Sequence, residues 1–143
     1  MKYEDIRDIV VVDLKIDRYK LAEESLRTPV ILARYLDIYR GEKQTLHQLT
    51  GKMNILKKEK RLYYSGKADP AVYEEKPFDL RILKQELDLY IEYDEDVINL
   101  TYKISMQKEK CFYLEKVIKG IEQREFSVKN AITVIKFESG DPG

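Results

Sequence analysis

The most regular stretch of the sequence is VINLTYKISMQKEKCFYLEKVIKGI, which runs from Val97 to Ile121. Its apolar residues recur at alternating steps of three and four, which is the spacing of a coiled-coil seam. One polar residue, Gln107, interrupts that seam, whose full set is Val97, Leu100, Ile104, Gln107, Cys111, Leu114, Ile118 and Ile121. The stretch therefore predicts a helix of about 25 residues and an all-α fold class of long amphipathic helices.

The residues that follow predict a last helix, beginning at Ser127 as its N-cap and ended by Gly140 and Pro142. Two consecutive amphipathic helices are what a helical oligomer requires, but packing within one chain would explain the same pattern, and both interpretations stay open. We expect self-assembly into a homo-oligomer through the apolar positions of both helices, which are Val97, Leu100, Ile104, Cys111, Leu114, Ile118, Ile121, Ile132 and Ile135.

Before Val97, a third helix is expected from about Asp79, and it ends in the acidic run Glu92-Tyr93-Asp94-Glu95-Asp96. This run lacks the glycine and the downstream glutamate of an EF-hand loop. We interpret it as a cap, with Asp94 or Asp96 at the start of the long helix. Residues 69–78 follow turn residues and predict an exposed linker.

The first half of the chain predicts two more helices. One runs from an N-cap at Asp17 to Arg40-Gly41, with a kink or a break expected after Leu26 because of Pro29. The other runs from Glu42 to about Tyr64, where Gly66 serves as its C-cap. Its apolar seam consists of Leu46, Leu49, Met53 and Leu56, and the next seam position is occupied by Lys60. The β-branched run at residues 9–12 predicts that residues 1–16 are extended.

Length and composition limit the classes of protein to consider. A chain of 143 residues with 36% charged residues suits one domain of long exposed helices. We expect an N-terminal helical region at 1–68, the linker, and a C-terminal oligomerisation region at 79–143, forming one compact unit. The single cysteine excludes an internal disulfide, and no apolar run reaches about 18 residues, so we expect a soluble intracellular protein. Glycine-rich phosphate loops, metal-ligand spacings and catalytic triads are missing, so we expect no enzyme and no cofactor.

The charges are unevenly distributed, although the formal net charge is zero. Residues 40–68 carry 8 cations and 2 anions, and residues 69–96 carry 3 cations and 10 anions. The basic block ends in Lys57-Lys58-Glu59-Lys60-Arg61-Leu62-Tyr63-Tyr64. On a helix, its cations share one face with a tyrosine ring, a combination that suits single-stranded nucleic acid. A solvated helix end would show the same pattern. The candidate DNA-binding residues are Lys57, Lys58, Lys60, Arg61 and Tyr64.

The sequence as a whole resembles the UvsY family, the recombination mediator proteins of T-even-like bacteriophages. The resemblance covers nearly the whole chain and is weakest after Gly66, through the third helix and at Pro29. The motifs that carry it are the basic helix end into Tyr63-Tyr64-Ser65-Gly66, Asp17 with Lys20-Leu21, Asp94-Glu95-Asp96-Val97, Phe126-Ser127-Val128-Lys129 and Phe137-Glu138-Ser139-Gly140.

The resemblance implies a non-enzymatic protein that binds single-stranded DNA as a ring-like homo-oligomer of six or seven subunits. Its implied partners are the phage recombinase and the phage single-strand-binding protein, in the cytoplasm of the infected bacterial host. It also implies that Lys58 and Lys60 contact DNA, with Arg61 as a candidate replacement one residue along, and that about Val97 to Phe137 serve self-assembly. A helical adaptor that acts only through protein contacts is the alternative.

Overall fold

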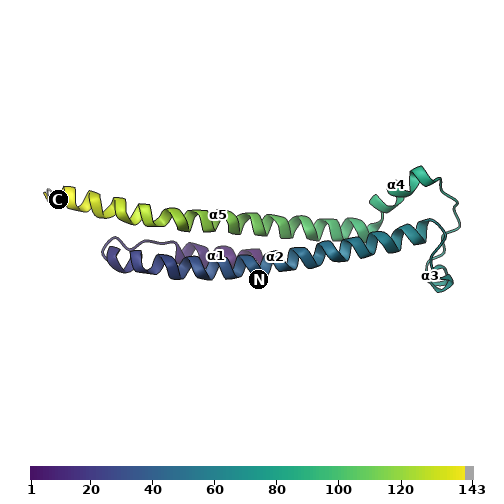
Figure 1. Cartoon of the computed structure of the whole chain (residues 1–143), viewed down its shortest axis with the longest axis horizontal. Helices are drawn as coiled ribbons and strands as arrows, with labels where there is room; N and C mark the ends of the chain where they lie inside the picture. Colours follow the sequence, from purple (N-terminus) through teal and green to yellow (C-terminus); the bar gives the residue numbers. More distant parts are fainter. Residues whose placement is uncertain (141–143) are drawn as a thin grey trace. The chain divides into compact units, whose positions relative to one another are not determined.

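The computed structural model describes residues 1–140, which form helices joined by turns and loops (Figure 1). The expected all-α fold class is therefore confirmed. Pro142, expected to help end the last helix, lies outside the described residues. In chain order the elements are α1 (Tyr3–Asp13), α2 (Leu21–Tyr64), α3 (Pro70–Glu75), the 3-10 helix η1 (Lys84–Glu86), α4 (Leu87–Glu92) and α5 (Glu95–Glu138).

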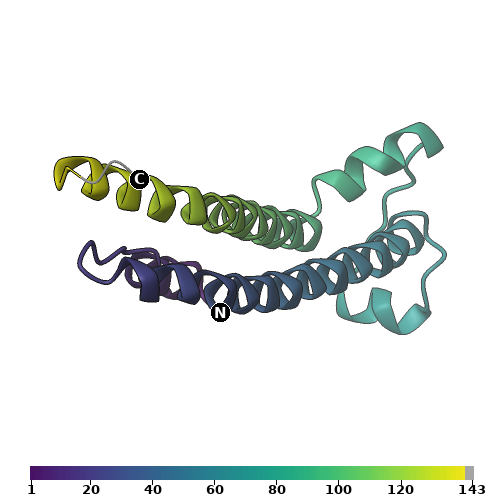
Figure 2. The same ribbon diagram turned by 60° about the vertical axis from the view of Figure 1, so that its left-hand side comes forward.

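The chain divides into two compact units. Unit 1 consists of Met1–Lys43 with Glu109–Gly143, and unit 2 consists of Gln44–Lys108. The uninterrupted helices α2 and α5 each contribute residues to both units (Figure 2). Each unit has its own cluster of buried apolar side chains. None of the described helices combines the length and the apolar composition needed to cross a lipid bilayer.

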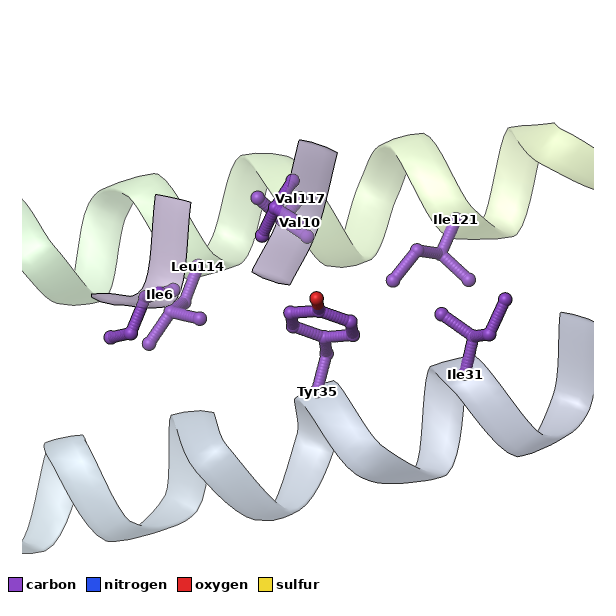
Figure 3. Close-up of a cluster of buried hydrophobic side chains, with 7 residues drawn as sticks. All are labelled: Ile6, Val10, Ile31, Tyr35, Leu114, Val117 and Ile121. Carbon is purple, nitrogen blue, oxygen red and sulfur yellow. The ribbon is translucent and has the colours of Figure 1, made fainter. Parts of the chain in front are cut away.

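Three helices build the core of unit 1. Figure 3 shows side chains of α1, α2 and α5 converging on one another; the set is Ile6, Val10, Ile31, Tyr35, Leu114, Val117 and Ile121. Tyr35 is fully buried, and its hydroxyl donates to Asp13 Oδ2 at 2.9 Å. Arg34 binds the same carboxylate at 2.8 Å. Burial raises the pKa of Tyr35, and the hydrogen bond to Asp13 raises it further.

Helix α1 corrects the expectation that residues 1–16 are extended. The β-branched run lies inside α1, because Ile6, Val10 and Asp13 fall on one helical face that packs into the unit 1 core. Tyr3 adds an edge-on ring contact with Tyr113, at 5.2 Å between centroids. Tertiary burial here outweighs the weak preference of valine and isoleucine for strands.

Helix α2 corrects the expectation of two separate helices. It begins at Leu21, after a turn in which Asp17 Oδ1 accepts from the Tyr19 N–H at 2.9 Å, so Asp17 is not its N-cap. No break follows Leu26, because buried residues on both sides of Pro29, Thr28 and Ile31, hold the helix against its neighbours.

The helix also continues through Gly41, where an end was expected. The next residue, Glu42, is only 7% exposed. Its carboxylate lies 3.0 Å from the N-terminal amino group of Met1 and 3.5 Å from Lys110 Nζ. These ion pairs hold the backbone beside Gly41 in the helix, so the glycine does not end it.

Unit 2 has a smaller core, with Met53 from α2, Leu87 and Ile91 from α4, and Val97 from α5. The third helix was expected from about Asp79, but residues 77–83 are not helical, and the chain reaches η1 and then α4 only from Lys84. The expected linker at 69–78 contains the short helix α3, whose N-cap is Asp69.

Helix α5 is longer than the expected 25 residues, since it has 44. Ser127 lies inside it and caps no separate helix, so this expectation was wrong. The buried seam continues past Ile121 through Arg124, which is charged, and Val128. Gly140 follows the helix with a φ of 78°, the left-handed conformation that glycine adopts without strain.

Candidate nucleic-acid interface

The C-terminal end of α2 is fixed by a Schellman motif. Gly66 has a φ of 78°, and the Lys67 N–H donates to the Leu62 carbonyl at 2.9 Å. The Gly66 N–H donates to the Tyr63 carbonyl at 3.2 Å. The expected C-cap at Gly66 is thus confirmed, and the basic residues just before it lie on regular helix.

The tyrosine pair of this helix end belongs to a cluster of five aromatic rings, which are Tyr63, Tyr64, Tyr73, Phe78 and Tyr90. Tyr63 stacks on Tyr73 from α3 at 5.4 Å, and Tyr64 makes an edge contact with Phe78 at 5.1 Å. The Tyr73 hydroxyl also donates to the Tyr63 carbonyl at 2.7 Å. The ring of Tyr64 is therefore packed inside unit 2, where it stabilises the fold and offers little open face to a nucleobase.

Lys60, the seam position at the end of α2, is held by two aspartates. Its Nζ lies 2.8 Å from Asp96 Oδ2 and 3.3 Å from Asp94 Oδ2, and its side chain is 15% exposed. Burial disfavours the charged ammonium, but the hydrogen bonds and charges of these carboxylates outweigh it, and the pKa of Lys60 is raised. The sequence placed Lys60 on the seam but gave no sign of these partners.

Asp94 joins this lysine to the start of α5. Its Oδ1 accepts from the N–H groups of Asp96 at 2.9 Å and Val97 at 3.3 Å, so the expected cap at Asp94 is confirmed. Its Oδ2 accepts from the Tyr64 hydroxyl at 2.5 Å. Although burial opposes its charge, the hydrogen bonds from Tyr64 and Val97 and the charge of Lys60 lower the pKa of Asp94. Burial of Tyr64 raises the pKa of its hydroxyl, and its hydrogen bond to Asp94 raises it further.

The other cations of the helix end are accessible. Lys57 and Lys58 are exposed. Arg61 is also exposed, and its Nη2 lies 2.8 Å from Asp88 Oδ1, with side chains 57% and 81% accessible. An ion pair this open is worth about 0–1 kcal/mol, so Arg61 can exchange Asp88 for a phosphate at little cost. Of the five predicted DNA-binding residues, the structure thus exposes Lys57, Lys58 and Arg61, and it packs Lys60 and Tyr64 into unit 2.

An open groove of about 600 Å³ lies beside these exposed cations. Lys57 and Arg61 of α2 line it together with residues of α4, α5 and the turn between them, which are Asp88, Ile91, Glu92, Tyr93, Val97, Ile98 and Thr101. Sequence reasoning assigned Tyr93 no role, because it sits within an acidic run that was interpreted only as a cap.

The residues predicted to serve self-assembly are mostly used inside the subunit. Val97, Cys111, Leu114 and Ile121 are 0–3% exposed, and Leu100, Ile104, Ile118 and Ile132 are half-buried. Ile135, at 38%, is the exposed member of the set. Burial also raises the pKa of the Cys111 thiol. Packing within one chain accounts for the heptad pattern of the buried positions, and the role of this set in assembly stays a prediction.

The Asp94 network predicts a measurable contribution to stability. We expect Asp94→Ala to lower the free energy of unfolding by about 2–3 kcal/mol, because it removes an N-cap worth about 1 kcal/mol, leaves the partly buried Tyr64 hydroxyl without its acceptor and takes one of two carboxylates from Lys60. Chemical denaturation followed by circular dichroism at pH 7 measures this loss.

Asp94→Asn is the matched control, since asparagine still caps the helix but carries no charge. Because the pKa of Asp94 is lowered by folding, its charge stabilises the fold above the ordinary value of about 3.9. That contribution is lost as the pH falls through the folded-state pKa. The gap between wild type and Asp94→Asn should therefore shrink below pH ~4. A gap independent of pH would contradict the assignment.

The chain is similar to known recombination proteins. The family model described as "Recombination, repair and ssDNA binding protein UvsY" matches residues 10–141. The recombination protein UvsY of Enterobacteria phage T4 is 21% identical over 140 residues, which cover 98% of this chain and 99% of that protein.

Solved structures show the same fold. The crystal structure of the bacteriophage T4 recombination mediator protein UvsY in lattice type II matches with a TM-score of 0.84 and 21% identity, over 97% of this chain and 98% of that chain. The lattice type I structure matches with a TM-score of 0.83 and 21% identity, over 94% and 98%. Since the family model spans nearly the whole sequence, the chain belongs to the UvsY family of recombination, repair and single-stranded-DNA-binding proteins.

Proposed function

We propose that this protein is a recombination mediator that binds single-stranded DNA through the C-terminal end of α2. It acts as a ring-like homo-oligomer and promotes loading of the phage recombinase onto DNA coated by single-strand-binding protein, in the cytoplasm of the infected host. The observation that supports this most is the group of exposed cations, Lys57, Lys58 and Arg61, at one helix end of a chain from this family.

Each subunit offers a weak contact by itself. Three or four phosphates neutralised per subunit correspond to a log–log salt slope of about −2 to −3, at roughly 0.7 per phosphate on a single strand. The lower value applies to Lys57, Lys58 and Arg61 alone, and the higher value requires Lys60 to leave its aspartates. Several such contacts on one assembly raise the avidity by about 10² to 10⁴.

Exposed apolar side chains in unit 1 support self-assembly. They are Val11, Val12, Leu26, Val30, Phe112, Phe126, Val134, Ile135 and Phe137, each at least 38% exposed. Covering these apolar side chains with a second copy of the chain removes their surface from water, which lowers the free energy and favours association. We propose that these positions, of which Ile135 was already predicted, contact neighbouring subunits, while the buried heptad residues hold the subunit together.

The alternative is a helical adaptor that works only through protein contacts. The pairing of Lys60 with Asp94 and Asp96, and of Arg61 with Asp88, favours it, because these pairs are satisfied without a ligand. In that case the acidic residues of α4 and its neighbours would meet a partner.

One set of measurements on the full chain tests the proposal. Light scattering gives the subunit number, fluorescence anisotropy at several salt concentrations gives binding to single-stranded and duplex DNA, and recombinase assembly is followed on strands coated by single-strand-binding protein. The mediator assembles, prefers single strands and accelerates recombinase loading. A monomer, or an oligomer that does not bind single strands at low salt, contradicts it.

The aspartates that hold the cations should compete with DNA. We expect Asp88→Asn/Asp96→Asn to tighten single-strand binding by roughly 2- to 30-fold, since it releases Arg61 and removes the more exposed of the two aspartates that hold Lys60, with each pair worth about 0.2–1 kcal/mol. Asp94 stays in place because it caps α5. Anisotropy titration at fixed salt measures the change.

The matched control, Glu86→Gln/Glu95→Gln, removes the same charge at two exposed positions of the same region. It should tighten binding less than the aspartate variant. Equal gains in both variants would mean that general charge, and not release of the two cations, sets the affinity.

A further inference from the structure

The groove beside the end of α2 brings together two kinds of group that bind nucleic acid. Lys57 and Arg61 are four residues apart on α2, so they project from one face, about 6 Å apart along the helix axis. Ile91 and Val97, both buried, give the groove an apolar part. Tyr93 and Ile98 line it with exposed side chains, 69% and 48% accessible.

Tyr93 differs from the other rings near the end of α2. The five aromatic residues of the cluster around Tyr64 contact one another. Tyr93 makes no ring contact within the described residues 1–140. It sits at the C-cap of α4, where its backbone N–H donates to the Leu89 carbonyl at 3.1 Å and the next N–H, of Asp94, donates to the Ile91 carbonyl at 3.2 Å. The backbone is thus held while the ring face stays accessible.

We infer that this groove receives a nucleobase of bound single-stranded DNA, which stacks on Tyr93 while neighbouring phosphates contact Lys57 and Arg61. This inference rests on the proposed DNA binding and names the ring that takes part in it. Stacking on an aromatic ring tolerates every base, because each base has a π-face. Tyr93 therefore takes the role that the sequence suggested for Tyr64.

The acidic residues of the groove are compatible with this ligand. Asp88 and Glu92 line it as well, and their charges repel phosphates. Asp88 is paired with Arg61 and gives way to a phosphate. The Glu92 carboxylate can accept a hydrogen bond from the exocyclic amino group of adenine, cytosine or guanine, a contact that thymine does not offer and that stacking does not need. The cations of α2 then contact the phosphates on their own side of the groove.

A second hollow, of about 270 Å³, is a weaker candidate. It is lined by Tyr63 with Glu59, Lys60, Asp69 and Lys76, among others. The Tyr63 ring is already stacked on Tyr73, and Lys60 is held by its aspartates. Neither group is free to meet a base without first breaking contacts inside unit 2.

A tryptophan reporter tests the inference directly, because the sequence contains no tryptophan. Tyr93→Trp should show quenched fluorescence when the protein is titrated with oligothymidylate at low salt. Tyr19→Trp is the control, since Tyr19 is 86% exposed in unit 1 and should respond little. Binding of the same oligonucleotide, carrying an end label, is followed in parallel by anisotropy.

Affinity gives the second readout. Tyr93→Ala should weaken binding by roughly 5- to 150-fold, and Tyr93→Phe should bind like wild type, because stacking needs only the ring. Both should keep their unfolding transition, as this ring packs against no other. If labelled DNA binds while Tyr93→Trp stays unquenched, or Tyr93→Ala binds normally, the inference is wrong and DNA binding stands. If no variant and no wild type binds DNA, the proposed function fails too.

Discussion

Reversing the charge of two lysines, in Lys57→Glu/Lys58→Glu, is expected to abolish detectable single-strand binding at physiological salt while the subunit stays folded. Both side chains are exposed and lie in the last turns of α2, before the Schellman motif. Replacing them therefore removes two phosphate contacts without disturbing packed groups. Surface changes of this kind alter stability by about 0.5 kcal/mol or less.

The size of the effect follows from counterion release. Each lost contact should make the log–log salt slope shallower by about 0.7, so the double variant loses about 1.4 per subunit from a slope near −2. The two new negative charges also repel the strand. Because every subunit carries the change, the loss of affinity at each contact is multiplied over all the contacts that one strand makes with the oligomer. The neutral variant Lys57→Gln/Lys58→Gln should fall between wild type and the reversal.

Anisotropy titrations between low and physiological salt measure both affinity and slope. The control is Lys119→Glu/Lys129→Glu, which makes the same charge change at two exposed lysines of unit 1. It should keep the slope of wild type. If the control loses binding as fully as the α2 variant, net charge governs binding and the end of α2 has no special role.

The sequence predicted the local features of the fold well. The cap at Asp94, the C-cap at Gly66, and helix over most of 21–64 and 97–121 all depend on neighbours in sequence, and the structure confirms them. What was missed depends on distant partners. The β-branched residues at 9–12 are helical because one face of α1, with Ile6 and Val10, packs into the core of unit 1.

Charged residues on the seams explain why two long helices were read as four. All three of Glu42, Lys60 and Arg124 occupy seam positions: Glu42 was taken as the start of a helix, Lys60 as the point where a seam ends, and Arg124 lies between the two helices that were expected within α5. In the structure each has an ion-pair partner far away in sequence or in the neighbouring helix, such as Lys110 for Glu42 and Glu24 for Arg124. A charged residue can continue a buried stripe when the fold brings an oppositely charged side chain next to it. The local sequence does not show which residue that partner is.

The same limit applied to the candidate site. The basic helix end was found because four cations lie within five residues of sequence, and three of them are exposed as a binding surface requires. Its tyrosine was chosen for being close in sequence. The ring with a free face, Tyr93, comes from a turn about thirty residues later and meets the basic helix only through the tertiary fold.

Arg124→Met is expected to cost about 3–5 kcal/mol of unfolding free energy, which is a large part of the ~5–15 kcal/mol that holds a typical domain folded. Arg124 is 4% exposed, and its Nη1 donates to the Glu24 carbonyl and to Thr28 Oγ1, both at 2.7 Å. Its Nη2 forms an ion pair with the Glu24 carboxylate, which is itself buried. Removing the guanidinium leaves that carboxylate with Arg27 as its remaining cation, at 2.8 Å.

The double variant Glu24→Met/Arg124→Met separates the loss of attraction from the cost of an unpaired buried charge. Replacing both members of a buried pair by apolar groups of similar size is often neutral or stabilising, so the double variant should regain most of the lost stability. Arg40→Met, at an exposed arginine of α2, is the control and should change stability by less than about 0.5 kcal/mol.

Urea denaturation at one fixed protein concentration measures all three variants, because association would otherwise shift the midpoints. A double variant as unstable as Arg124→Met would mean that the pair itself supplies the stability of unit 1. A recovered double variant means instead that the pair adds little net stability, so that its role is to specify which faces of α2 and α5 meet and not to hold them together. That second outcome fits the seam, because a charge pair that adds little net stability still rejects every register in which either charge is buried alone.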